Sequence, residues 1–155
     1  DYPRARDIPR AGFAGGPCLF KDTMQLAAFA NNQFSLGHAA MQINEGLVLY
    51  LADEIGNKYE LDKLVVGLLG MAFKADSDDT RGSLSYKLKN VLTFCAKEVI
   101  TTDPYVTSDP DLKPLETVLA KSDLLVLCVP HGTYRHLRVE GKPLVDIWGF
   151  LEDKK

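Results

Sequence analysis

Leu64-Val-Val-Gly-Leu-Leu-Gly70 is a short apolar run rich in branched side chains. A run of this length and composition is typical of a β-strand buried on both faces of a sheet. Further apolar runs alternate with helical patterns: strands are expected near 98–102, 124–129 and 143–147, and helices near 82–97, 114–121 and 132–137. Because strands that alternate with helices form parallel sheets, the sequence predicts an α/β fold with helices on both faces.

A long helical pattern precedes this alternation. Ser35 is expected to cap the helix, which runs to about Ile55 and is stopped by Gly56-Asn57. A shorter helix is expected near 22–31. The long helix can pack on the α/β unit through one face, but its apolar content is too high for a single buried face. We therefore favour a homodimer through this helix. Its apolar residues are Ala39, Ile43, Leu47, Val48, Leu49, Tyr50 and Leu51.

The segment after the first strand, residues 71–83, is a long polar turn. It lacks the G-x-G-x-x-G spacing of a dinucleotide-binding turn, since Gly67 and Gly70 are spaced wrongly for that motif. It presents Lys74 and Arg81 above the carboxyl end of the strand, where open α/β sheets bind ligands. The turn is therefore predicted to contact a ligand without holding a dinucleotide in the standard way.

The second informative stretch is Gly12-Phe-Ala-Gly-Gly-Pro-Cys-Leu-Phe-Lys-Asp22. Its glycines open a loop, and its single cysteine comes directly before a helical run. At a helix N-terminus the free amides and the helix dipole favour thiolate, the nucleophilic form of cysteine. A buried, inert Cys18 is the alternative, because free cysteines often pack as small hydrophobes.

Two charged residues follow Cys18. Asp22 lies four residues later, on the same helix face if the helix begins near the cysteine, so it could hold a water or take a proton. It could equally complement the helix dipole only. Lys21 could bind a phosphate or favour the thiolate, or could simply be solvated. Together these residues form a plausible site for covalent catalysis.

Other polar residues allow two readings each. His131 follows a strand and could touch a ligand or be an ordinary loop histidine. Asp103-Pro104 is more typical of a turn than of a ribose-binding acid. The acids of 76–79 are more typical of a solvated or capping cluster than of a metal site, and no metal site is predicted. Cys95 and Cys128 lie in apolar patterns and are predicted to be core residues.

Composition narrows the classes of function. A net charge of −3 without a basic cluster argues against nucleic acid as a partner. No apolar run approaches the roughly 20 residues of a membrane span, and no signal peptide is visible. Three cysteines without paired spacing suit a reducing compartment, so a cytoplasmic location is expected.

The two loops, in this order, resemble those of the nucleotide-sugar 6-dehydrogenases, the UDP-glucose and GDP-mannose dehydrogenase family. The family's catalytic loop has the form G-F-G-G-S-C-F-x-K-D, which residues 12–22 match at most positions. Its nucleotide-binding loop has the form G-x-A-F-K-x-x-x-x-D-x-R, which residues 70–81 match. The resemblance implies a long connecting helix followed by a Rossmann-like parallel sheet. It further implies that 1–60 is the end of the central region, that 61–155 is the C-terminal nucleotide-sugar-binding domain, and that the N-terminal NAD-binding domain is absent.

The resemblance also implies a chemistry. The family oxidises the C6 alcohol of a UDP-sugar or GDP-sugar to a carboxylate in two hydride transfers to NAD, through a cysteine-bound thiohemiacetal and thioester. Cys18 would be the nucleophile, and Asp22 would help to activate it or the hydrolytic water. The substrate would be bound by Gly12, Phe13, Ala14, Gly15, Gly16, Phe73 and Lys74. The cofactor would be reached by Leu19, Phe20, Lys21 and Arg81.

Two departures from the family pattern touch the substrate side. Pro17 stands where serine or histidine is usual, and Asp146-Ile-Trp-Gly-Phe150 replaces a segment that often carries a substrate-binding arginine. Arg4 could match a family arginine that reaches the neighbouring subunit. Little dehydrogenase activity is expected of this chain alone. A non-catalytic nucleotide-binding or regulatory module is the alternative, and it would show an ordinary rate of Cys18 alkylation.

Overall fold

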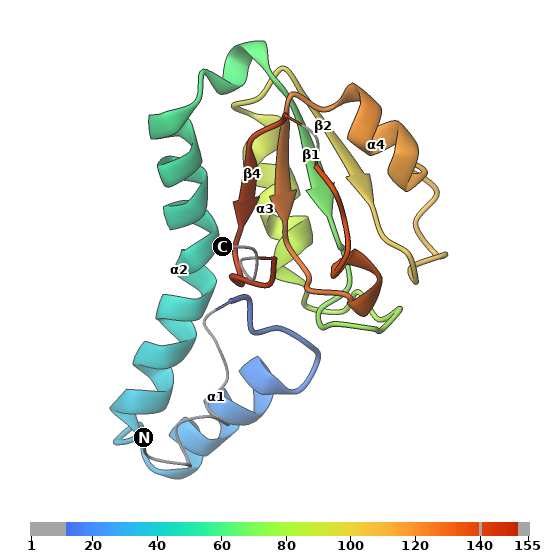
Figure 1. Ribbon diagram of the computed structural model, residues 1–155. Helices are drawn as coiled ribbons and strands as arrows, with labels where there is room; N and C mark the ends of the chain where they lie inside the picture. Colours follow the sequence, from blue (N-terminus) through green and yellow to red (C-terminus); the bar gives the residue numbers. More distant parts are fainter. Residues whose placement is uncertain (1–11, 140, 152–155) are drawn as a thin grey trace, which may run out of the picture.

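One parallel sheet of four strands forms the centre of the computed structural model, which describes residues 12–139 and 141–151 (Figure 1). The strand order is β2-β1-β3-β4, and each neighbouring pair is parallel. Both the α/β class and the parallel sheet are therefore confirmed. The strands are β1 (Val65–Leu69), β2 (Glu98–Thr102), β3 (Leu124–Leu127) and β4 (Leu144–Asp146).

Helices cover both faces of this sheet. Successive side chains of a strand point to opposite faces, and β1 follows this rule. Val66 and Leu68 pack in a core with residues of α2 and α3, whereas Leu69 packs in a second core with residues of α4. β1 therefore has an apolar layer on each side, as its continuous apolar run predicts. The helices are α2 (Ser35–Lys58), α3 (Leu84–Thr93) and α4 (Leu115–Lys121).

Gly67 explains how closely α4 approaches the sheet. A Cβ atom at this position would overlap the Ser122 hydroxyl and lie 2.8 Å from Val118 Cγ1. Val118 in the middle of α4 and Ser122 directly after the helix are both buried. The glycine in the middle of β1 therefore serves helix packing on the face opposite α3.

The segment before the sheet consists of α1 (Leu19–Phe29) and the long helix α2. The two helices are separated by Asn31 and Asn32, which both have positive φ angles. Ser35 is the first residue of α2 and Phe34 occupies the N-cap position, so the predicted role of Ser35 as the cap is wrong. The helix also continues through Gly56-Asn57 to Lys58, because the Tyr59 amide still donates to Ile55 O at 3.0 Å. Residues 61–63 (η2) then lead into β1.

Two other predictions need correction. Cys95 is exposed, because α3 ends at Thr93 and the chain turns there to reach β2, leaving Cys95 on the solvent side. The helix expected near 132–137 is a single 3₁₀ turn, η3 (Gly132–Tyr134). Cys128 is fully buried, as predicted. None of the helices in the described ranges is long and apolar enough to cross a membrane.

Candidate functional site

Two loops that are far apart in the sequence pack against each other near the carboxyl ends of the strands (Figure 1). We call residues 12–18 the glycine loop and residues 70–83 the strand-end loop. A Cβ at Gly16 would lie 2.9 Å from the Phe73 ring, and one at Gly82 would lie 3.0 Å from Gly16 O. Gly16 also has a φ of 109°, which other residues rarely adopt. The two stretches that carry the family resemblance therefore form one surface.

Cys18 lies at the start of α1, where it occupies the N-cap position. Its side chain is exposed and makes no capping bond, while its carbonyl accepts the Asp22 amide at 2.8 Å. The sequence-based expectation of a thiol at a helix N-terminus is therefore met in the structure. The buried alternative is excluded for Cys18.

Basic side chains surround this end of the surface. Lys21 pairs with Asp22 at 2.6 Å, and Arg81 pairs with Asp79 at 2.7 Å. These carboxylates raise the pKa of Lys21 and of Arg81, and the Cys18 thiolate adds a smaller effect in both cases. The Arg81 hydrogen bonds also lower the pKa of Asp79 to about 2. Both cations are therefore fixed in their charged form beside the cysteine.

Phe73 and Lys74 form the part of the strand-end loop that faces outward. Phe73 is half-buried against the glycine loop, and Lys74 is exposed, with its ammonium 5.5 Å from the Phe73 ring centroid. The Phe73 amide donates to Asp79 O at 2.9 Å, which closes the loop on itself. An aromatic face and an exposed cation thus lie next to each other on the surface.

The remaining residues of the glycine loop have different surroundings. Phe13 is 5% exposed and belongs to the core, whereas Ala14 is exposed. The Asn44 side chain of α2 bonds to both backbone polar groups of Ala14. It accepts from Ala14 N at 3.2 Å and donates to Ala14 O at 2.7 Å. Sequence reasoning missed Asn44, because a polar residue inside a helix gives no sign of its tertiary partner.

Trp148 is a second residue that sequence reasoning missed. A Cβ at Gly12 would overlap the Trp148 ring, and the Trp148 indole donates to Cys128 O at 2.8 Å. The segment 146–150, which departs from the family pattern, therefore packs against the glycine loop. Its tryptophan connects that loop to the end of β3.

A cavity of about 240 Å³ lies between the glycine loop, α1 and α2. It is smaller than the roughly 300–1,000 Å³ of typical ligand pockets, so a nucleotide sugar would need additional surface. Glu45 and Lys87 form an ion pair on its wall. The lining residues are Ala14, Gly15, Gly16, Leu19, Phe20, Met41, Asn44, Glu45, Gly82 and Lys87.

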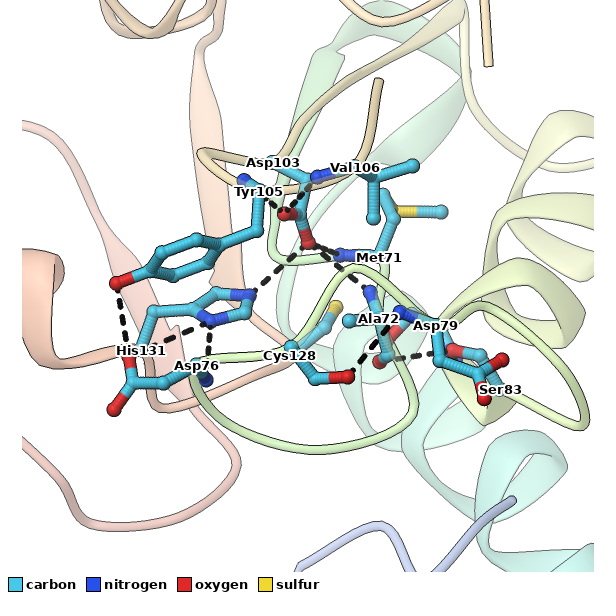
Figure 2. Close-up of polar contacts among 12 residues, drawn as sticks. Met71, Ala72, Asp76, Asp79, Ser83, Asp103, Tyr105, Val106, Cys128 and His131 are labelled. Atoms are coloured by element: carbon cyan, nitrogen blue, oxygen red, sulfur yellow. Dashed lines mark hydrogen bonds and ion pairs between the residues drawn. The ribbon is translucent and has the colours of Figure 1, made fainter. Parts of the chain in front are cut away.

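Asp103 and His131 lie beneath the strand-end loop. His131 is 0% exposed and bonds to Asp103, so it is neither an exposed ligand contact nor an ordinary loop histidine (Figure 2). Asp103 lies beyond β2, and its carboxylate accepts from Tyr105 N and Val106 N, which confirms the predicted turn. The full burial of this carboxylate was not predicted from the sequence. Among the described residues, no cluster of three side chains could hold a metal ion. Arg4 lies outside the described residues.

The sequence of this chain matches those of known proteins. Residues 67–153 match the model of the UDP-glucose/GDP-mannose dehydrogenase family, UDP binding domain. The chain is 32% identical over 145 residues to a UDP-N-acetyl-D-mannosamine dehydrogenase from Pyrococcus horikoshii, covering 90% of this chain and 34% of the relative. The chain thus spans about a third of that curated relative's length.

Solved structures agree with this assignment. A UDP-D-ManNAc dehydrogenase structure from Pyrococcus horikoshii aligns with a TM-score of 0.78 and 28% identity, covering 95% of this chain and 37% of that one. A ternary complex of GDP-mannose dehydrogenase from Pseudomonas aeruginosa aligns with a TM-score of 0.77 and 29% identity, covering 96% of this chain and 39% of that one. Since the family model also matches more than half of the sequence, the chain belongs to the UDP-glucose/GDP-mannose dehydrogenase family and contains its UDP binding domain.

Proposed function

We propose that this chain supplies the nucleophile and part of the substrate site of an NAD-dependent nucleotide-sugar 6-dehydrogenase. Residues 1–60 would be the end of the central region, and residues 61–155 the nucleotide-sugar-binding domain. The observation that carries the proposal is the packing of the glycine loop on the strand-end loop. This packing brings an exposed thiol at a helix start to the same surface as Lys74 and Arg81.

The proposed reaction explains why a cysteine is needed. Oxidation of a C6 alcohol by loss of one hydride from carbon and one proton from the hydroxyl group gives an aldehyde, and a single hydride transfer stops there. Addition of the Cys18 thiolate to the aldehyde carbon forms a thiohemiacetal, whose C–H hydride can leave in a second oxidation and give a thioester. Water then attacks the thioester carbonyl and releases the carboxylate and the Cys18 thiol. Asp22 is placed one helical turn from Cys18 and is our candidate for orienting this water or accepting its proton.

The cations near Cys18 have a role in this chemistry. Attack requires the thiolate, which a helix N-terminus and neighbouring cations favour. Lys21 and Arg81 lie on this surface, but each is paired with a carboxylate, so the start of α1 is the main source of positive potential at Cys18. Lys74, which is exposed beside the Phe73 ring, is our candidate for binding the diphosphate of the substrate. In the same proposal the glycine loop would contact the sugar nucleotide through Gly12, Phe13, Ala14, Gly15 and Gly16.

We also propose that the surface next to Cys18 contacts the NAD cofactor. Leu19 and Phe20 are apolar yet 41% and 50% exposed, and the exposed cations Lys21 and Arg81 accompany them. Apolar side chains can hold the rings of NAD and cations its phosphates. When bound, NAD accepts the hydride in each oxidation. The four residues would orient it towards the substrate and exclude water.

We further propose that the chain forms a homodimer through α2. Leu36, Ile43 and Tyr50 are spaced by seven residues, so they lie near one another along a single face of the helix. They are 76%, 75% and 59% exposed. An exposed apolar face of this kind is typical of a protein–protein interface.

Calorimetric titration with UDP, UDP-glucose, UDP-N-acetylmannosamine and GDP-mannose tests the proposed function. One nucleotide class should bind, and Lys74→Ala should weaken its binding roughly ten- to hundredfold, because a charge-assisted bond to phosphate contributes about 1.5–3 kcal/mol. Lys97→Ala is the matched control, since Lys97 is also exposed but lies before β2. Equal affinities of the two lysine variants would contradict the role of Lys74. Failure of every ligand to bind the wild-type chain would contradict nucleotide-sugar binding by this chain.

A further inference from the structure

A hydrogen-bond network centred on the buried side chains of Asp103 and His131 lies under the outward-facing part of the strand-end loop (Figure 2). Asp103 is its centre. One carboxylate oxygen accepts from Met71 N at 2.6 Å and from Ala72 N at 3.0 Å, and the other accepts from Tyr105 N and Val106 N at 2.8 and 3.0 Å. Asp103 therefore fixes the two residues that come directly before Phe73.

His131 fixes the other end of the same segment. Its Nδ1 lies 2.9 Å from Asp76 N, which donates to it, and its Nε2 lies 3.0 Å from Asp103 Oδ2. Because an acceptor at Nδ1 leaves the ring proton on Nε2, the imidazole is neutral and donates to Asp103. With 0% exposure and both nitrogens occupied, His131 has no free atom to offer a ligand.

Asp76 completes the network. It has a φ of 52°, which is uncommon for a residue other than glycine, and its carboxylate accepts from Gly132 N at 2.8 Å and from the Tyr105 hydroxyl at 3.2 Å. The strained residue is thus bonded through its backbone to His131 and through its side chain to the segments that follow β2 and β3. Structure around a strained position must hold it in place.

From these contacts we propose that Asp103 and His131 act as positioning residues for Phe73-Lys74-Ala75, by holding the amides on both sides of this tripeptide. The consequence for nucleotide binding rests on the proposed function. A lysine reaches a diphosphate with little loss of freedom only if its backbone is already in place. His131 acts through Asp76 N, and Asp103 acts through Met71 N, Ala72 N and the orientation of His131.

Two substitutions of His131 separate its two bonds. His131→Asn keeps an acceptor near the position of Nδ1 and loses the bond to Asp103. The four backbone amides that donate to Asp103 remain in place. His131→Gln places a donor near the position of Nε2 and loses the acceptor for Asp76 N. The pair therefore distinguishes the loss of a polar residue from the loss of the bond that holds the tripeptide.

The experiment measures amide hydrogen exchange and calorimetric UDP affinity of the 155-residue chain. For His131→Gln we expect faster exchange confined to residues 73–76 and roughly three- to tenfold weaker UDP binding, the effect of one lost hydrogen bond. His131→Asn should restore both properties most of the way to wild type. His136→Asn, at an exposed histidine of the same segment, is the control.

The exchange rates at residues 73–76 test the positioning role. Wild-type exchange at 73–76 in His131→Gln would overturn the positioning role. Faster exchange throughout β1 and β3 in both His131 variants would also overturn it, because it would show general destabilisation instead. If the wild-type chain does not bind UDP, the proposed nucleotide binding is contradicted. The exchange data still test the positioning role independently.

Discussion

At the scale of single residues, Asp103 is a carboxylate whose burial is offset by its partners. Burial would raise the pKa of Asp103, but the hydrogen bonds from His131, Met71, Tyr105 and Val106 outweigh this effect and hold the pKa at about 2. The carboxylate is therefore more stable as an anion in the folded chain than in the unfolded chain. This makes Asp103 a source of pH-dependent stability.

The sign of that dependence follows from the lowered pKa. The contribution is fully present above the unfolded value near 3.9 and is lost as the pH falls towards 2. Because the pKa falls from an ordinary value of 3.8 to about 2, the contribution is about 2 kcal/mol. Urea unfolding between pH 5 and pH 2.5 should show that Asp103→Asn loses less stability on acidification than wild type does. Asp111→Asn, at an exposed acid, serves as the control; equal pH profiles for wild type and Asp103→Asn would contradict the assignment.

Residue roles in this network were only partly predictable. Residues 70–81 match a family loop, so Phe73 and Lys74 could be singled out from the sequence. Asp103 and His131 lie 28 residues apart and meet only because β1, β2 and β3 end side by side. Hydrophobic periodicity and secondary-structure propensity report local structure. They cannot show a contact between residues that only the assembly of the sheet brings together. For the same reason the sequence does not predict the contacts of Asn44 and Trp148 with the glycine loop.

At the scale of elements, α2 is the one whose surface does not fit a single buried face. Its buried residues, such as Val48, Ala52 and Ile55, pack against the α/β unit, while the stripe of Leu36, Ile43 and Tyr50 remains exposed. Sequence periodicity predicted this helix well. Its C-terminal boundary was missed because Gly56 and Asn57 are weak helix formers rather than obligatory stops, and the last turn still closes on Ile55.

The exposed stripe gives a prediction about association. Sedimentation equilibrium should show a dimer for wild type and a monomer for Ile43→Lys, because an unpaired lysine at a dimer interface would have to be desolvated. Asn57→Lys, an exposed site near the end of α2, should leave the dimer intact. A monomeric wild type, or an Ile43→Lys variant that still dimerises, would contradict association through this face.

At the scale of the whole molecule, the fold brings the glycine loop and the strand-end loop together from opposite ends of a long connection. The glycine loop comes before α1, and the strand-end loop follows β1, yet Phe73 packs on Gly16. The sequence could identify each loop by its pattern. Their contact depends on α2 carrying the glycine loop back to the sheet, and on Asn44 and Trp148 holding it there.

Alkylation of Cys18 tests the central claim most directly, because Cys95 in the same chain is an internal reference. Both thiols are exposed, but Cys18 is at the start of α1, and Cys95 follows the end of α3, where the dipole is negative. With iodoacetamide and mass spectrometry, Cys18 should react roughly two- to fivefold faster than Cys95, since a helix terminus contributes about 0.3–1 kcal/mol. Saturating UDP-sugar should protect Cys18 and leave Cys95 unchanged. Equal rates at the two cysteines, with no protection of Cys18 by any nucleotide sugar, would contradict a reactive thiol beside a nucleotide-sugar site.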